Sequence, residues 1–249
     1  FYYKTFMGIP PLEWGSGTGM WMRYERLIRR AAGMGEASRL PDPDHYEHAH
    51  AFCDVLVVGA GPAGIAAAGA AAESGLDVVL VEQDNLLGGA QLSTPCGGSE
   101  SIPSVQELES SGVRVMTRTT AFGLYDYNVA GLVERVTDHL PDPPGYLPRQ
   151  RFWTLRTKYT IVAAGAIERH IAFGNNDRPG VMTAAAARTY LNRFAVLPGE
   201  NIIIATNNDS AYEGAVELSS AGAKVTLLDA RSAISDEHMQ QLTERNIEV

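Results

Sequence analysis

The fold of this chain is decided by Cys53–Asp84, which reads CDVLVVGAGPAGIAAAGAAAESGLDVVLVEQD. The short run Val55–Val58 is apolar and β-branched, which is typical of a buried parallel strand. An Ala- and Gly-rich segment of good helix formers follows, and Gly75 then marks the end of a helix. A second apolar run, Val78–Val81, leads to Glu82. The order strand, helix, strand predicts a Rossmann-like βαβ unit.

A glycine-rich loop joins the first predicted strand to the helix. Gly59 allows a tight turn, Gly61 lets the backbone approach a pyrophosphate because it has no Cβ, and Gly64 permits close helix–strand packing. The free N–H groups and the dipole at the start of the helix attract phosphates. Glu82 follows Gly59 by 23 positions, where an acid accepts hydrogen bonds from ribose hydroxyls. These features predict a dinucleotide site, and the alternative is a Rossmann unit that kept its shape without a ligand.

Composition excludes several classes of protein. The 249 residues are 45% hydrophobic and 20% charged, which suits a globular protein of one or two domains. The net charge of −9 leaves no basic excess for binding nucleic acid. Cys53 and Cys96 form no CxxC motif and no metal-ligand spacing, so we expect ordinary thiols in a reducing, cytoplasmic compartment. We expect no metal site, and no segment resembles a signal peptide or a membrane span.

The first 50 residues predict an entry region ahead of the dinucleotide unit. Residues 1–19 resemble the tail of a preceding domain, and Met20–Ala32 has the spacing of a helix. Its apolar stripe, which includes Leu27, is expected to pack, and the alternative is a surface for a partner subunit. Leu40–Ala51 is interpreted as a polar linker, and its three histidines suit a loop better than a metal site. Because the chain starts with Phe1 and ends as a strand begins, we interpret it as an internal part of a longer polypeptide.

The segments after Glu82 extend the first unit. The turn Leu87–Ala90 is expected beside the ligand, and Gln91–Ile102 is expected to be loop. A short helix over Val105–Ser111 and a third parallel strand over Val113–Thr117 follow. Thr119–Tyr127 would then lie at the carboxyl end of that strand, where open α/β sheets bind ligands.

A small antiparallel excursion is predicted next. Val129–Val136 and Arg151–Lys158 have strand patterns around a proline-rich turn. Thr160–Ala163 is expected to return as a separate buried strand that ends at a turn containing Gly165. This order is typical of flavoproteins with two dinucleotide-binding domains.

A second βαβ unit is predicted near the end of the chain. A helix over Thr183–Phe194 leads to strands at Asn201–Ala205 and Lys224–Leu228 and to a helix over Ser210–Ala221. The positions that correspond to the fingerprint glycines carry Thr206, Asn208 and Ala211. A Cβ at each position obstructs a pyrophosphate, so we expect a structural duplicate without a nucleotide of its own. The alternative is that Asn207, Asn208 and Asp209 present polar groups to a ligand or to the first unit.

The predicted fold class is therefore α/β, a Rossmann-like fold with two dinucleotide-binding domains of the FAD/NAD(P)-binding flavoprotein type, incomplete at the C-terminus. Residues 1–50 would hold the end of a preceding ferredoxin-like domain with a helix and linker. Residues 51–194 would form the dinucleotide-binding domain with its β-meander. Residues 195–249 would be a truncated, degenerate second Rossmann-like domain.

Several segments together resemble the α subunits of heterotetrameric sarcosine oxidases, and the related large subunits of opine oxidase, cyanide synthase and dye-linked proline dehydrogenase. The resemblance covers nearly the whole chain. The segments are Trp21–Glu25 (WMRYE), Ile28–Gly33 (IRRAAG), Pro41–Asp44 (PDPD), Thr119–Gly123 (TTAFG), Asn175–Met182 (NNDRPGVM) and Asn207–Tyr212 (NNDSAY). The last two are much more specific than the glycine fingerprint.

The resemblance implies a role in an oxidoreductase complex that acts on CH–NH donors. Sarcosine would be demethylated oxidatively to glycine with formation of H2O2. The one-carbon unit would pass to tetrahydrofolate on a C-terminal half of the α subunit, or leave as formaldehyde. The partners would be β, γ and δ subunits, with amine oxidation at FAD in the β subunit and a covalent FMN near the α–β interface. No nucleic-acid or membrane partner is implied.

The resemblance also implies that this chain's own site holds NAD. By position the contacts would include Ala63, Glu82, Gln83, Asp84, Ala90 and Ala121. Ala90 stands where the family leads us to expect Ser or Thr, and the segment before Val113 is shorter than usual. The complete predicted set of cofactor-binding residues is Gly59, Ala60, Gly61, Pro62, Ala63, Gly64, Glu82, Gln83, Asp84, Gly89, Ala90, Ala121 and Gly165.

The identity of the bound nucleotide and the function of the protein both stay open at this stage. The fingerprint suits FAD as well as NAD. By itself it leads us to favour FAD, whereas the resemblance leads us to favour NAD in the same pocket. The protein would be a subunit of a sarcosine oxidase, a self-contained FAD-dependent pyridine-nucleotide oxidoreductase, or a non-catalytic nucleotide-binding scaffold of an opine or amino-acid dehydrogenase complex. No catalytic residue is predicted here, because Arg169 and His170 are better explained as structural, and the chain alone is expected to be inactive.

Overall fold

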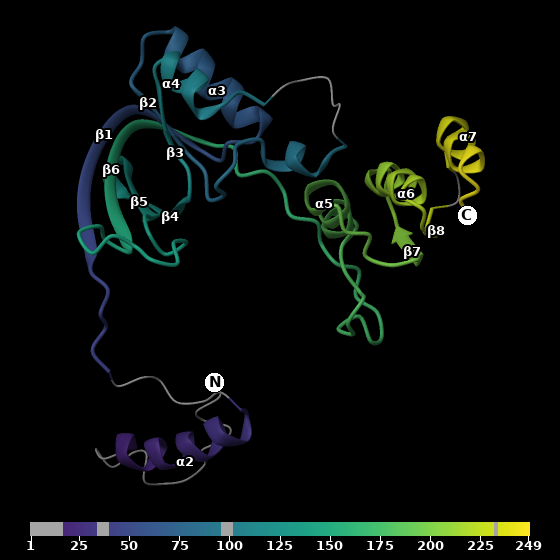
Figure 1. Cartoon of the computed structure of the whole chain (residues 1–249), viewed down its shortest axis with the longest axis horizontal. Helices are drawn as coiled ribbons and strands as arrows, with labels where there is room; N and C mark the ends of the chain where they lie inside the picture. Colours follow the sequence, from purple (N-terminus) through teal and green to yellow (C-terminus); the bar gives the residue numbers. More distant parts are fainter. Residues whose placement is uncertain (1–16, 34–39, 96–101, 232–233) are drawn as a thin grey trace. The chain divides into compact units, whose positions relative to one another are not determined.

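The computed structural model describes residues 17–33, 40–95, 102–231 and 234–249, and of residues 17–23 only the backbone. The chain divides into two units, residues 1–43 and 44–249, and each is considered by itself. In the first unit, helix α2 (Gly17–Ala31) confirms the predicted helix (Figure 1). Leu27 of its apolar stripe is 73% exposed within this unit, and the packing of the stripe stays a prediction. The predicted domain tail falls largely on residues outside the described ranges.

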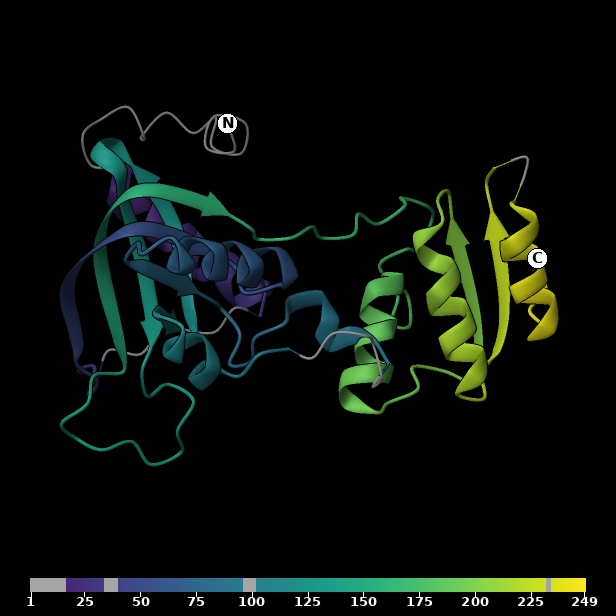
Figure 2. The ribbon, with the colours of Figure 1, turned by 90° about the horizontal axis from the view of Figure 1, so that it is seen from above.

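The second unit is built on a six-stranded sheet with the strand order β3-β2-β1-β6-β5-β4. Strands β1 (Tyr46–Val58), β2 (Val78–Val81) and β3 (Val113–Met116) are parallel to one another, as predicted. Strand β6 (Gln150–Val162) runs parallel to β1 along its whole length, and Figure 2 shows the two strands side by side. The sheet therefore combines a parallel half with a meander.

The meander supplies the remaining strands of this sheet. Strand β5 (Val129–Arg135) is antiparallel both to β6 and to β4 (Thr119–Tyr125). A short 3-10 turn, η3 (Asp126–Asn128), joins β4 to β5. The predicted antiparallel excursion is confirmed, and Thr119–Tyr125 belongs to it as a strand.

Two predictions in this region are wrong. The expected polar linker ends early, because Tyr46–Ala51 already belongs to β1, where each residue pairs with β6. The expected separate strand over Thr160–Ala163 is the end of the single strand β6, and it is not buried, since Val162 is 63% exposed. Both errors have one cause. Strands β1 and β6 are longer than their local sequence patterns predict, because each is stabilised by pairing with the other.

Helices cover one face of the parallel strands. They are α3 (Pro62–Glu73) and α4 (Val105–Ser110), and the latter begins with a capping box between Ser104 and Glu107. A core cluster forms beneath them from Val55 and Val57 of β1, Val78 and Leu80 of β2, Ala60, Ala68, Leu87, Leu108 and Val113. Alanine at the helix surface keeps the helix close to the sheet, which brings the amino end of α3 to the end of β1.

The opposite face of the parallel strands is covered by the meander. Its cluster joins Val79 and Val81 of β2 to Leu132 of β5 and Leu155 of β6. Cys53 is fully buried in the same cluster, and burial raises the pKa of its thiol. Cys96 lies outside the described residues. Helices thus cover one face of the parallel strands and the meander covers the other, and the site lies at the ends of these strands.

The C-terminal part forms the predicted second βαβ unit. Strands β7 (Asn201–Thr206) and β8 (Lys224–Asp229) are parallel and joined by α6 (Ser210–Ser220). Helix α7 (Asp236–Glu244) follows, and a single bridge from Glu248 to Thr226 begins the expected next strand. The three-part division predicted from the sequence, with boundaries after residues 50 and 194, stays a prediction.

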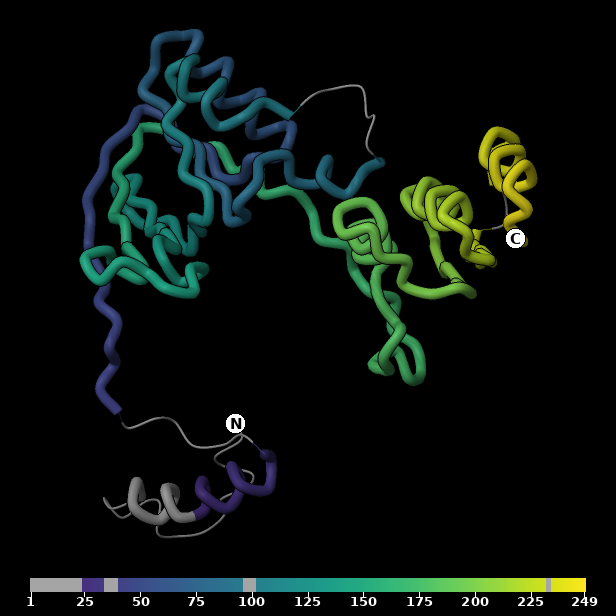
Figure 3. Tube along the Cα trace, in the orientation of Figure 1, coloured from purple at the N-terminus to yellow at the C-terminus, as the bar shows by residue number. Residues whose placement is uncertain are grey.

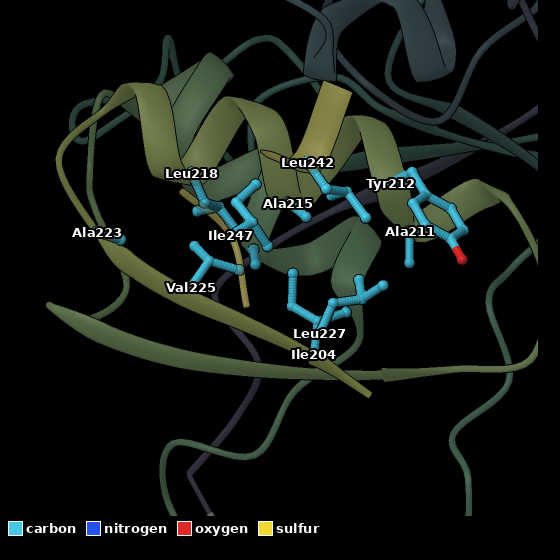
Figure 4. Packing of buried hydrophobic residues seen from close by; sticks show 11 residues of the cluster. Ile204, Ala211, Tyr212, Ala215, Leu218, Ala223, Val225, Leu227, Leu242 and Ile247 are labelled. Atoms are coloured by element: carbon cyan, nitrogen blue, oxygen red, sulfur yellow. The ribbon is translucent and has the colours of Figure 1, made fainter. Parts of the chain in front are cut away.

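The core of this unit lies on one face of its two strands. Figure 4 shows Ala211, Ala215 and Leu218 of α6 against Ile204 and Leu227 of the strands. The other face is open in this chain, because Ile203 is 72% and Leu228 is 54% exposed.

One helix connects the two βαβ units. The backbone leaves β6 at residue 162, continues without regular structure and enters α5 (Ala184–Phe194), a path that Figure 3 traces. The helix begins at the N-cap Thr183, whose hydroxyl accepts a hydrogen bond from the Ala186 amide. It packs against both η2 (Gly89–Ser93) and α6.

Candidate dinucleotide site

The glycine loop lies where β1 ends and α3 begins. Gly59 adopts φ +99°, a left-handed conformation that side chains rarely take, and its amide donates to the Val81 carbonyl at 2.8 Å. A Cβ on Gly59 would stand 2.5 Å from the Ala163 carbonyl oxygen. A Cβ on Gly64 would stand 1.8 Å from the Gly59 carbonyl oxygen. Both glycines are therefore required by the fold itself.

The middle glycine differs from the other two. Among the residues that the structure describes, a Cβ on Gly61 would meet no atom within 4 Å apart from its chain neighbours. Gly61 is the N-cap of α3 and Pro62 follows it, so the Ala63 and Gly64 amides precede the first helical hydrogen bond, which the Ile65 amide donates to the Gly61 carbonyl at 3.0 Å. Open space beside free amides at a helix start fits the pyrophosphate of a dinucleotide.

The turn after β2 forms the other side of this space. The Gly88 amide donates to the Ala60 carbonyl at 2.8 Å, and a Cβ on Gly89 would stand 3.0 Å from the Gly61 Cα. Ala90 follows in η2 and is exposed. Gly61 and Gly89, 28 positions apart, thus lie against each other.

Glu82 is held between two backbone amides. One carboxylate oxygen accepts from the Ala60 amide at 2.8 Å and the other from the Asp84 amide at 2.9 Å. The residue is 8% exposed, and its own amide donates to the Met116 carbonyl at the end of β3. Each carboxylate oxygen has a second lone pair, so both retain capacity to accept a ribose hydroxyl.

The residues after Glu82 turn toward other elements. Asp84 forms a bidentate ion pair with Arg193 of α5, with N–O distances of 2.6 and 3.0 Å. Hydrogen bonds from Arg193 hold the pKa of the Asp84 carboxyl below its usual range. The Gln83 side chain is exposed, while its carbonyl accepts from Arg135 at 2.6 Å. Arg193 could not be predicted as a partner of Asp84, because it lies 109 positions later in the chain.

The two remaining predicted site residues lie at different ends of the region. Gly165, at φ +71°, follows Ala163, whose carbonyl faces Gly59. Ala121 packs against the cluster that contains Leu132, and β4 reaches the site through the Thr119 amide, which donates to the Glu82 carbonyl at 2.8 Å. The structure therefore gathers the glycine loop, the turn after β2 and the end of β6, while the side chain of Ala121 points into a core.

The corresponding turn of the second βαβ unit is filled by its own side chains. The Thr206 hydroxyl donates to the Asn208 carbonyl, and the Asn208 side chain accepts from the Ser210 amide. Asp229, at the tip of β8, accepts from Arg231 and from the Tyr212 hydroxyl, and these bonds lower the pKa of its carboxyl strongly. That this unit holds no nucleotide stays a prediction, and the filled turn favours it.

Among the described residues, no three His, Cys, Asp or Glu side chains gather as ligands for a metal ion. Within the same ranges, every helix is too short or too polar to cross a lipid bilayer.

The family of the chain follows from its sequence as a whole. Residues 53–249 match the family model described as pyridine nucleotide-disulphide oxidoreductase. The chain belongs to this family. The match includes the glycine loop, Glu82, the meander and the second βαβ unit, so the predicted fold class is confirmed.

Curated relatives refine this placement. The chain is 47% identical over 242 residues to the sarcosine oxidase subunit alpha of Rhizobium meliloti (strain 1021), which covers 94% of this chain and 24% of that protein. It is 40% identical over 222 residues to the sarcosine oxidase subunit alpha of Corynebacterium sp. (strain U-96), covering 86% and 23%. The chain thus spans about a quarter of the length of these relatives, and the resemblance stated from its motifs is confirmed.

Solved structures share the fold. L-proline dehydrogenase from P. horikoshii superposes with a TM-score of 0.59 at 25% identity, covering 76% of this chain and 38% of that one. Thioredoxin reductase from T. acidophilum gives a TM-score of 0.53 at 18% identity, covering 79% and 63%. The second likeness supports the fold alone.

Proposed function

We propose that this chain is the dinucleotide-binding part of the α subunit of a multisubunit sarcosine oxidase, and that its site holds NAD. The observation that carries the proposal is the open space at Gly61, bordered by α3 and Glu82, in a chain 47% identical to a sarcosine oxidase subunit alpha. Gly59 and Gly64 maintain the fold, whereas Gly61 faces only free space. A dinucleotide explains why glycine is needed there as well.

The proposed contacts follow from this geometry. The pyrophosphate would lie over Gly61 against the first amides of α3, and the Glu82 carboxylate would accept from the ribose hydroxyls. Gly89 lies beside the same space, because a Cβ there would stand 3.0 Å from the Gly61 Cα, and Gln83 and Ala90 would be further contacts. NAD and FAD are both two-electron carriers that share this binding mode, and FAD is the alternative occupant.

The activity of the complete complex is also a proposal. Sarcosine would be oxidised to glycine at a flavin of the β subunit, with the one-carbon unit passing to tetrahydrofolate or leaving as formaldehyde, and with H2O2 as product. The γ and δ subunits, FAD and FMN would complete the assembly. We assign no residue of this chain to the amine chemistry, since the groups proposed to contact the dinucleotide are backbone amides and the Glu82 carboxylate.

The ligand can be identified directly. We expect one NAD for each chain when the full-length α subunit, separated from the flavin-carrying subunits, is denatured and the released small molecules are identified by mass spectrometry. The absorbance of the released fraction provides a control, since an oxidised flavin is yellow and NAD is colourless. FAD in stoichiometric amount from this site would favour a flavin-dependent reductase and contradict the NAD proposal.

Replacing Glu82 with Gln is expected to weaken dinucleotide binding about tenfold or more. An amide retains one acceptor oxygen, so the charge-assisted hydrogen bonds to the ribose, each contributing roughly 1.5–3 kcal/mol, are reduced. Calorimetric titration of ligand-stripped protein measures the change. Glu73→Gln is the matched control, because Glu73 is the exposed last residue of α3. Equal affinity for the Glu82 variant and wild type would remove Glu82 from the site.

A further inference from the structure

The structure connects helix α5 to the dinucleotide site through one ion pair. Arg193, in the last turn of α5, binds both carboxylate oxygens of Asp84. The Arg193 and Asp84 side chains are 24% and 31% exposed, so solvent screens the pair and its contribution to stability is small. Its geometry is nevertheless specific, because a bidentate guanidinium–carboxylate pair fixes both orientation and distance.

Asp84 is also the residue that holds Glu82. Its amide donates to one Glu82 oxygen at 2.9 Å, while the other Glu82 oxygen accepts from the Ala60 amide of the glycine loop at 2.8 Å. The Asp84 carbonyl accepts from the Arg118 amide at 2.8 Å. The Asp84 carboxylate also accepts from the Asn85 amide at 2.7 Å, so Arg193 of α5 is the partner of this side chain that lies far from it in the sequence.

Helix α5 is itself anchored beside the site. The Thr189 hydroxyl lies 2.9 Å from the Ser93 hydroxyl, and the Asn192 amide group donates to the Ser93 carbonyl at 2.9 Å. Ser93 ends η2, the turn that starts at Gly89 next to Gly61. Arg193 is thus presented from a fixed helix, which a loop residue would not provide.

We propose that Arg193 is a positioning residue of the dinucleotide site. By holding the Asp84 carboxylate, it keeps the Asp84 amide on Glu82, and Glu82 in turn is held in position to accept from both the glycine loop and the ribose. The inference rests on the proposed function for the ribose contact, whereas the hold on Glu82 exists without a ligand. It gives α5 an indirect part in nucleotide affinity through Arg193, which lies 109 positions after Asp84.

The binding test compares two arginines of the same helix. Arg193→Gln removes the pair with Asp84, and Arg188→Gln, the matched control, removes a pair with Glu217 of α6. In calorimetric titrations of the ligand-stripped complete protein with NAD, and in parallel with FAD, we expect about tenfold weaker binding for the first variant. We expect no more than about twofold for the control, and partial recovery with Arg193→Lys, which keeps the charge but not the bidentate geometry.

A double variant distinguishes positioning from simple loss of charge. If Arg193 acts through Asp84, Asp84→Asn combined with Arg193→Gln will bind no more weakly than the weaker of the two single variants. Multiplying losses, or unchanged affinity in the Arg193→Gln protein, would overturn the inference while leaving the proposed function intact.

A ligand-free measurement separates the two proposals. Hydrogen–deuterium exchange of peptides that contain Ala60 is expected to be faster in Arg193→Gln than in wild type and in Arg188→Gln, because the Ala60 amide is held by Glu82. Unchanged exchange overturns the inference. A wild-type protein that binds neither dinucleotide overturns the proposed function, and the exchange rates still decide whether Arg193 holds Glu82.

Discussion

Replacing Gly64 with alanine is expected to lower the free energy of unfolding by about 3 kcal/mol or more. The new Cβ would stand 1.8 Å from the Gly59 carbonyl oxygen and 3.3 Å from the Ala163 Cβ. The first of these atoms is backbone and cannot rotate away. Helix α3 would have to move off the sheet, which opens the core beneath Ala68.

A second glycine of the same helix serves as the control. A Cβ on Gly69 would meet no atom within 4 Å, and Gly69 lies in the interior of α3. Alanine there is expected to raise stability by about 0.5–1 kcal/mol, since it restricts the unfolded chain and favours the helix. Chemical denaturation of the complete protein measures both variants. Similar midpoints for the two would show that α3 does not pack on the loop as closely as the structure has it.

Replacing Gly61 with alanine is expected to have the opposite profile, with a normal fold and dinucleotide affinity reduced about 100-fold or more. The backbone at Gly61 has φ −73° and ψ 179°, which alanine adopts without strain, and no protein atom opposes the new methyl group. The methyl group would occupy the place proposed for the pyrophosphate. Losing two charge-assisted hydrogen bonds to backbone amides, roughly 1.5–3 kcal/mol each, corresponds to that loss of affinity.

Two measurements on the Gly61→Ala protein test this prediction. Its denaturation midpoint is compared with wild type, and its affinity for NAD and FAD is obtained by calorimetric titration after the ligand is removed. Weak binding with unchanged stability is the expected result. Retained affinity would mean that the phosphates do not approach Gly61, and the site would then need another location.

The helices and strands around the glycine loop could be predicted from the sequence, because the residues that begin and end them lie close by in the chain. The run Val78–Val81 is bounded by Asp77 and Glu82, and the strand occupies those four residues. Gly75 ends α3 at φ +77°, where a side chain would be strained. Ser104 and Glu107 form the capping box that fixes the start of α4. In each case the residue that determines the boundary lies within a few positions of it.

The roles of the glycines were only partly visible in the sequence. The fingerprint predicted that Gly59, Gly61 and Gly64 serve a dinucleotide site, and the spacing to Glu82 located the acid. The structure separates them, since two are required by close backbone contacts and only Gly61 faces free space. Gly64 is confined by the nearby Gly59 carbonyl, whereas Gly59 is confined by the carbonyl of Ala163, which follows β6 about 100 residues later.

What the sequence by itself determined was therefore the βαβ order, the fingerprint, the position of Glu82 and the family. What only the tertiary structure decided was the length of β1 and β6, the open space at Gly61 and the hold of Arg193 on Asp84. Periodicity, capping and turn propensity act over a few residues, so they can be read along the chain. Strand pairing and ion pairs join residues about 100 positions apart, and their partners are chosen only when the sheet and helices have packed.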